Sequence, residues 1–165
     1  MRPTTVRPPR DLLRYRAATT EDVSFLRALY GTTREEELRQ MAWDDEAKAR
    51  FLDHQFLAQS KHYESFYPDA EFLVIELEGE RIGRLYVDRG PQTIEVIDIA
   101  LMPEHRRCGI GTMLLAEILA EGQSSGKSVT IYVEHFNPAR HLYDRLGFRH
   151  VDTNGVYHLM EWSAS

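Results

Sequence analysis

The sequence lacks three features that would place it in other classes of protein. Cys108 is the only cysteine among 165 residues, so a disulfide framework within the chain is excluded. No apolar run approaches the roughly 18 residues that a membrane-spanning helix needs. Positive charge is also scarce, with 20 Lys and Arg against 26 Asp and Glu, which argues against non-specific nucleic-acid binding. We therefore expect a cytoplasmic protein that binds neither membrane nor nucleic acid.

The N-terminal stretch "MRPTTVRPPRD" is basic and rich in proline, but it has no apolar core of the kind found in a secretory signal. We expect residues 1–11 to form a flexible tail, with a basic docking arm as the less favoured alternative. The rest of the chain has the length and the 42% hydrophobic content of one globular unit. Residues 12–165 are therefore predicted to form a single domain.

Apolar periodicity predicts a mixed α/β domain. Strands are expected at 13–19, 71–78, 81–89, 92–102, 128–136, 148–153 and 156–162, and helices at 20–31, 34–43, from 44 or 45 onward, 109–122 and 137–148. Most neighbouring strands should be antiparallel, with hairpin turns at Gly79 and at Asn154-Gly155. One parallel pair is expected where strand 92–102 crosses over helix 109–122 to strand 128–136.

The segment "HRRCGIGTMLL" (105–115) places two glycines and two arginines where a helix begins. Glycine lets backbone N–H groups approach a ligand, and the first turn of a helix leaves such groups without partners. Together with the helix dipole this favours a phosphate group. A glycine-rich turn with two solvated arginines is the alternative. The segment matches neither a dinucleotide-binding fingerprint nor a P-loop.

Two longer segments resemble the GNAT family of N-acetyltransferases. "DIALMPEHRRCGIGTMLL" (98–115) is similar to the family's acyl-CoA-binding segment, a strand followed by Arg/Gln-x-x-Gly-x-Gly/Ala at a helix start. "NPARHLYDRLGF" (137–148) resembles its second hallmark, and the likeness covers roughly residues 71–162. The N-terminal third looks like that of a widespread bacterial subgroup whose acceptor is unassigned. The resemblance implies a mostly antiparallel central sheet of six to seven strands flanked by about four helices.

The resemblance also implies that acetyl-CoA is the cosubstrate. The exposed backbone of 99–101 would pair with the pantetheine arm, and the N–H groups of 107–112 would hold the pyrophosphate. Arg106 and Arg107 would add charge, and Cys108 would supply a backbone N–H rather than a nucleophile. The cofactor-binding set is thus Ile99, Ala100, Leu101, Arg106, Arg107, Cys108, Gly109, Ile110, Gly111, Thr112 and Asn137. Asn137 lies six residues before Tyr143, where many members have seven, so its contact stays open.

For catalysis, the resemblance implies that Tyr143 protonates the leaving thiolate, and that a backbone N–H near Leu101 polarises the thioester carbonyl. The general base is Glu95, with Asp98, Glu134 or a water chain as alternatives. Glu95 and Asp98 have opposite strand parity, so both can face one cleft only if the strand carries a bulge. No metal ligand set is expected, since the seven histidines show no recognisable ligand spacing.

The reaction expected is direct attack of a primary amine on acetyl-CoA in a ternary complex. A small-molecule amine is the first candidate acceptor, and the polar and aromatic residues of the N-terminal third are expected to line its pocket, although core packing would also explain them. These residues are Trp43, His54, Gln55, Gln59, His62, Tyr63 and Tyr67. The alternatives are a protein lysine or N-terminus, or a non-catalytic acyl-CoA sensor. The sequence allows a monomer or a homodimer.

Overall fold

The computed structural model describes residues 6–135 and 137–164. Its strands are β1 (Leu13–Ala17), β2 (Glu71–Leu77), β3 (Glu80–Arg89), β4 (Thr93–Leu101), β5 (Ser128–Glu134), β6 (Arg149–Asn154) and β7 (Tyr157–Trp162). Its α-helices are α1 (Val23–Thr33), α2 (Glu35–Arg39), α3 (Asp45–Phe66), α4 (Ile110–Ser125) and α5 (Arg140–Arg145). Short 3-10 turns cover Arg10–Leu12, Thr20–Asp22 and Pro103–His105.

The strands form one seven-stranded sheet in the order β1-β2-β3-β4-β5-β7-β6. Only the β4–β5 pair is parallel among the described strands, and the other pairs are antiparallel. This confirms the predicted α/β class, the mostly antiparallel sheet and the single parallel crossover. The described residues contain five α-helices instead of about four, because Arg34 separates α2 from the end of α1.

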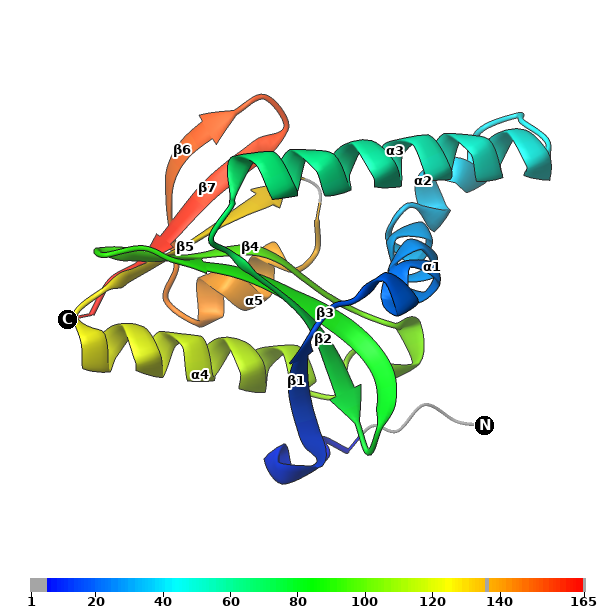
Figure 1. Ribbon diagram of the computed structural model, residues 1–165. Coiled ribbons are helices and arrows are strands. Elements are labelled where there is room, and N and C mark those ends of the chain that lie inside the picture. The colour runs from blue at the N-terminus through cyan, green and yellow to red at the C-terminus, as the bar shows by residue number, and fades with distance from the viewer. Residues whose placement is uncertain (1–5, 136, 165) are drawn as a thin grey trace.

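Helices cover both faces of this sheet, with α3 above and α4 below it in Figure 1. The α4 face holds the main apolar core, in which Leu114, Leu115 and Ile118 pack on the aliphatic residues of β3, β4 and β5. The α1 and α3 face has a much smaller apolar cluster, formed by Leu26, Tyr30, Phe56 and Val74. One face is therefore closed by aliphatic packing, and the other leaves room for polar side chains.

Two glycines that the sequence suggests as helix ends lie inside helices. Helix α1 continues past Gly31 to Thr33, and α4 continues past Gly122 to Ser125. Gly122 is required for close packing, since a Cβ there would lie 2.9 Å from the carbonyl oxygen of Lys127. The actual stop is Gly126, whose φ of 69° is the left-handed conformation that glycine adopts most easily.

The parallel pair at the centre of the sheet is short. Residues Thr93–Val96 of β4 pair with Ser128–Ile131 of β5, and no further pairs join the described parts of these strands. The β3–β4 register shifts between Tyr86 and Val87, because their partners are Asp98 and Val96 and Ile97 is the extra residue. A β-bulge of this kind bends its strand. Beyond Ile97 the two central strands diverge and open a cleft in the sheet.

Candidate active site

A cavity of about 750 Å³ lies where β4 and β5 diverge. Its walls are Ile97–Ala100 of β4, Ile131–Glu134 of β5, and side chains from α1 and α3. Asn137 and Tyr143 line the opposite end. The cavity thus runs from the helical face through the split in the sheet, so two ligands entering from opposite sides can meet there.

The bulge at Ile97 explains how the two predicted acids, Glu95 and Asp98, can point to the same face of the sheet. Ile94 and Val96 are buried in the core on the α4 side, so Glu95 points to the other face. The extra residue resets the alternation, and Asp98 then points to the same face as Glu95. Both acids line the cavity.

The divergence also leaves the backbone of β4 free along one edge. The Met102 N–H donates to Ile82 O across the β3 edge (2.8 Å). Because backbone groups alternate along a strand, those of Leu101 and Ile99 point away from β3, toward the cleft. Ile99 and Ala100 of the segment predicted to pair with pantetheine line the cavity, whereas the Leu101 carbonyl accepts from Arg106 Nε (2.8 Å).

The loop before α4 has the backbone geometry of an anion seat. Gly109 has φ 88° and Arg107 has φ 60°, a value uncommon for a residue with a side chain. No described atom lies within 4 Å of a Cβ built at Gly111, so the start of α4 is open. Arg7 lies beside the loop, since a Cβ at Gly109 would be 3.3 Å from its Cδ. The N-terminal segment thus brings a third arginine to this loop, which sequence reasoning missed.

Three other predicted loop residues sit within the same structure. The Cys108 side chain is buried and its Sγ donates to His105 O (3.1 Å), which is the environment of an inert thiol. Ile110 is buried in the core beneath the first turn of α4. Thr112 lies in that turn, so its N–H belongs to the set that helix geometry leaves unpaired.

Arg106 is placed differently from Arg107. Its Nε donates to Leu101 O (2.8 Å) and its Nη2 donates to Thr32 Oγ1 (2.8 Å). The guanidinium therefore links the edge of β4 to the end of α1, whereas Arg107 is exposed beside the open start of α4. The two arginines, for which the prediction gave one role, therefore have different surroundings in this structure.

Tyr143 lies on α5 with only 5% of its surface exposed, and its ring packs edge-on against Phe148 with centroids 5.8 Å apart. Burial raises the pKa of the Tyr143 phenol, and the nearby Asp98 charge raises this pKa further. Its O–H is therefore retained at any working pH. Asn137 lines the same end of the cavity, and its Oδ1 accepts from the Ala139 N–H at the start of α5 (2.9 Å).

The three candidate bases differ in their partners. Asp98 accepts from Arg84 Nε (2.6 Å), and Glu134 forms an ion pair with Arg34 (3.3 Å). Glu95 has a buried Oε2 with no hydrogen-bond partner among the described residues. A carboxylate held by a guanidinium must break that pair to take a proton, so Glu95 is the least encumbered of the three acids.

Tyr67 follows the last residue of α3, and its hydroxyl lies near the Glu95 carboxylate. Burial raises the pKa of Tyr67, and its hydrogen bond to the Glu95 carboxylate raises it further. This contact leaves Oε2 of Glu95 without a partner, as described above. Tyr67 therefore orients the carboxylate without neutralising its charge.

Arg84 is a buried charge that sequence reasoning missed. Its side chain is only 4% exposed, and besides Asp98 it donates to Gln59 Oε1 (3.2 Å) and lies over the Tyr86 ring at 4.8 Å. The sequence offers no signal for it, because an arginine in a strand usually points to solvent. Only the pairing of β3 with β4 brings it to the acids.

Aromatic side chains form the helical wall of the cavity. His62, Tyr63, Phe66 and Tyr67 follow one face of α3, and His62 stacks on Phe66 with centroids 5.2 Å apart. Gln59 also lines the cavity, as predicted. The other three predicted residues do not line it: Trp43 packs edge-on against Phe51, Gln55 accepts from the Tyr30 hydroxyl, and His54 is exposed.

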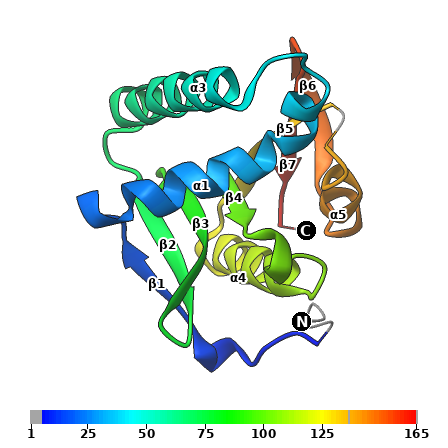
Figure 2. The same cartoon turned by 90° about the vertical axis from the view of Figure 1, so that its right-hand side faces the viewer.

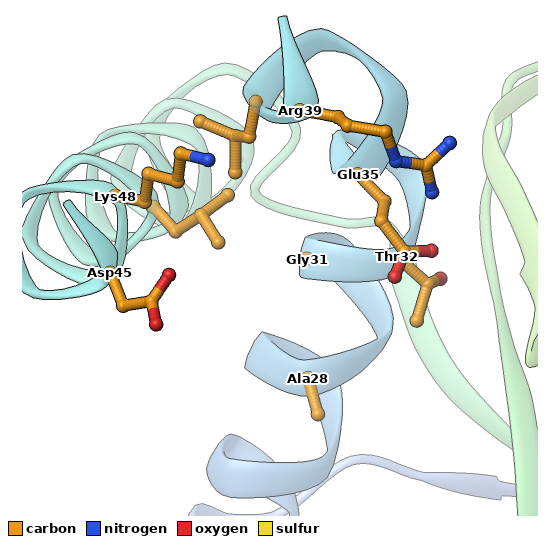
Figure 3. Close-up of a pocket in the computed structure, with 9 residues that line it drawn as sticks. Ala28, Gly31, Thr32, Glu35, Arg39, Asp45 and Lys48 are labelled. Atoms are coloured by element: carbon orange, nitrogen blue, oxygen red, sulfur yellow. The ribbon is translucent and has the colours of Figure 1, made fainter. Parts of the chain in front are cut away.

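A second hollow of about 480 Å³ lies between α1, α2 and α3. Figure 3 shows Asp45 and Lys48 of α3 on one side of it, and Glu35 and Arg39 on the other. Its described lining includes no residue of β4 or β5, so it is separate from the chemistry at the split sheet. Within the described ranges, no group of His, Cys, Asp and Glu is arranged to hold a metal ion. No described helix is long and apolar enough to cross a bilayer.

Comparison with known proteins agrees with this geometry. The model of the acetyltransferase (GNAT) family matches residues 32–148, which is more than half of the sequence. The chain therefore belongs to the acetyltransferase (GNAT) family. This defines its class, the GNAT acetyltransferases.

Two curated relatives are similar over part of their length. The [ribosomal protein bS18]-alanine N-acetyltransferase of Haemophilus influenzae is 31% identical over 64 residues, 38% of this chain and 44% of the relative. An N-alpha-acetyltransferase of Sulfurisphaera tokodaii is 30% identical over 111 residues, 58% of this chain and 64% of the relative. The chain thus spans less than two thirds of either relative.

Solved structures show the same fold over nearly the whole chain. The PaiA N-acetyltransferase of Thermoplasma acidophilum, in complex with coenzyme A, has a TM-score of 0.64 at 21% identity, covering 92% of this chain and 98% of that one. Spermidine N-acetyltransferase of Vibrio cholerae, in complex with CoA and spermine, has a TM-score of 0.61 at 19% identity, covering 93% and 96%. At such identities the likeness concerns the fold alone.

Proposed function

We propose that the protein transfers the acetyl group of acetyl-CoA to a primary amine by direct attack in a ternary complex. The observation that carries this proposal is the cavity at the split between β4 and β5. It joins a free strand edge and Tyr143 at one end to an unneutralised carboxylate, Glu95, at the other. Together with the open start of α4, this arrangement suits a thioester cosubstrate and a basic nucleophile.

In this mechanism the Ile99 and Leu101 backbone pairs with the two amides of pantetheine, as a neighbouring strand would. The pyrophosphate lies on the N–H groups of 107–112, with Arg107 as the charged partner. A further backbone N–H of this strand, near Leu101, donates to the thioester carbonyl oxygen and stabilises the charge that develops there. Asn137 borders the pantetheine end of the cavity through the turn that it caps.

Glu95 and Tyr143 handle the protons. Glu95 takes a proton from the acceptor ammonium, directly or through water, which frees the lone pair for attack. The C–N bond forms and the C–S bond breaks, while the nitrogen releases its second proton to water. The thiolate receives the Tyr143 proton, which solvent then replaces. A phenol with a raised pKa is fully protonated before this step, so it is always ready to donate.

The acceptor in this proposal is a small-molecule amine. The cavity has walls from α3, both central strands and the β6–β7 hairpin, so it encloses a ligand on several sides. A polypeptide N-terminus is the second candidate, because one curated relative is named [ribosomal protein bS18]-alanine N-acetyltransferase and the other N-alpha-acetyltransferase. The sequence alternative of a non-catalytic sensor is disfavoured, since a sensor needs neither Tyr143 nor Glu95.

The direct test is thiol release from acetyl-CoA by the purified protein, measured across small amines and short peptides. Tyr143→Phe and Glu95→Gln should each lower kcat by about 10²-fold or more, with acetyl-CoA affinity within about twofold of the parent. Normal turnover by both variants would remove them from the mechanism. Binding of acetyl-CoA without transfer to any acceptor would favour the sensor.

A further inference from the structure

The acceptor half of the cavity contains three acids and two arginines, and their pairing decides what charge it favours. Asp98 is paired with Arg84, and Glu134 is paired with Arg34. Glu95 has no cationic partner among the described residues, since its neighbour Tyr67 offers a neutral hydroxyl and its Oε2 accepts no hydrogen bond from them. The described side chains therefore leave one uncompensated negative charge in the cavity.

The surfaces around this charge are aromatic. Tyr63, Phe66 and Tyr67 line the cavity from α3, and Tyr132 of β5 and Tyr157 of β7 line it from the other side. Three of these rings are unusually exposed: Phe66 by 67%, Tyr132 by 45% and Tyr157 by 42%. Exposed aromatic rings contribute little to folding, and a ligand that covered them would remove apolar surface from water.

We propose, on the basis of the acetyl transfer proposed above, that the acceptor is an amine with a single positive charge on an apolar body. Glu95 receives its ammonium group, while Phe66, Tyr132 and Tyr157 pack against its hydrocarbon part. A polyamine is disfavoured, because Asp98 and Glu134 are already paired and leave no described carboxylate for a second ammonium. An amino acid is disfavoured as well, because Arg34 and Arg84 are both engaged and offer no ready partner for its carboxylate.

Equilibrium binding to the protein loaded with CoA tests this proposal without requiring turnover. The probes are 2-phenylethylamine, its uncharged analogue 2-phenylethanol, ethylamine and spermidine. We expect 2-phenylethylamine to bind about tenfold more tightly than each of the others, which corresponds to one charge-assisted contact or one buried ring face. In Glu95→Gln, 2-phenylethylamine and 2-phenylethanol should bind almost equally, since the charge that separates them is gone.

A second variant tests the apolar part. Phe66→Ala removes an exposed ring, so folding should be unaffected, and the affinity for 2-phenylethylamine should fall about fivefold while that for ethylamine stays the same. Leu57→Ala is the matched control, because Leu57 is 56% exposed on the same helix and does not line the cavity. It should leave both affinities unchanged.

Three outcomes would overturn the inference. They are tighter binding of spermidine than of 2-phenylethylamine, undiminished discrimination of amine from alcohol in Glu95→Gln, and acetylation of peptides by a protein that binds none of the four probes. In each case acetyl-CoA turnover can still be normal. Failure of the proposed function is distinguishable, because it would show as absent acetyl-CoA binding or absent transfer to every acceptor.

Discussion

The two faces of the sheet contrast in what they bury. The α4 face is closed by aliphatic side chains, many of them fully buried, whereas the α1 and α3 face buries Arg84 and carries Glu95, Asp98 and tyrosines around a cavity. In Figure 2, α1 and α3 lie on one side of the strands and α4 lies on the other. The same strands thus supply stability through one set of alternate residues and chemistry through the other. Substitutions on the first face should change stability, and those on the second should change turnover.

The largest effect is expected on the aliphatic face. Leu114 is fully buried in α4, so Leu114→Ala removes packed methyl groups and leaves a cavity. The free energy of unfolding should fall by about 2–5 kcal/mol, as measured by urea titration. The KM values for acetyl-CoA and amine should stay within about twofold below the transition. A large change in KM with unchanged stability would contradict the assignment of stability to the α4 face and of chemistry to the other face.

The next effect concerns an acid at the start of α1. Asp22 is 1% exposed and pairs with Arg16 and Arg81. Hydrogen bonding from Arg16 is the largest cause that holds the Asp22 pKa well below its usual value. Asp22→Asn should lower the free energy of unfolding by about 3 kcal/mol at pH 7, since it removes the buried charge that pairs with Arg16 and Arg81 and leaves Arg16 with Glu76 alone.

The acid dependence of this effect has a definite sign. A carboxyl whose folded pKa is lowered stabilises the protein above its unfolded pKa of about 4, and this contribution is lost as the pH falls from there toward the folded value. Urea titrations at pH 7, 5 and 3 should therefore show parent and Asp22→Asn converging toward low pH. Glu46→Gln is the control, because Glu46 and Arg50 form an exposed pair whose loss should change stability by about 0.5 kcal/mol or less.

A smaller effect is expected at Tyr67, which orients Glu95 on the open face. Tyr67→Phe keeps the ring and removes the hydroxyl that contacts the carboxylate. We expect kcat to fall about fivefold, because one hydrogen bond contributes about 1 kcal/mol, while the KM for acetyl-CoA stays constant. Steady-state kinetics with both substrates varied would measure this. A fall in stability with unchanged kcat would show that Tyr67 only packs α3 on the sheet.

Local patterns in the sequence predicted most of the fold and one end of the site. Alternation identified the strands, and the glycine-rich helix start and the Tyr143 segment each lie within a short stretch of chain. Gly122 and Gly126 bracket the end of α4 in the sequence, and the helix stops at Gly126. The reason for Gly122 is the close approach of Lys127, which lies beyond the helix. A contact between different elements does not change the apolar periodicity from which the helices and strands were predicted.

The acceptor end could be predicted only in part, because it depends on how distant strands pair. Glu95 and Asp98 share a face only through the bulge at Ile97, which appears in the register with β3. Arg84 reaches Asp98 through the same pairing. The sequence shows both acids and the arginine, but not which of them neutralise one another.

The smallest effect would test the link between the two ends of the cleft. Arg106 Nη2 donates to Thr32 Oγ1, and this bond ties the loop before α4 to α1. Tyr30 and Thr33 of α1, with Arg34 directly after it, line the proposed acceptor half of the cavity. Thr32→Val removes the acceptor oxygen with little change in shape. Loss of about 1 kcal/mol should raise the amine KM about fivefold and leave the acetyl-CoA KM unchanged, because α1 alone is released.

Arg107→Gln is the contrasting variant and should do the reverse, raising the KM for acetyl-CoA and leaving the amine KM constant. The two KM values, measured for both variants, distinguish an arginine that holds α1 in place from an arginine that binds phosphate. If Arg106 instead bound phosphate, Arg106→Gln would raise only the acetyl-CoA KM, as Arg107→Gln does, and Thr32→Val would change neither value. If Thr32→Val instead raises the amine KM and leaves the acetyl-CoA KM unchanged, then Arg106, a residue inside the predicted cosubstrate motif, sets the position of the acceptor wall.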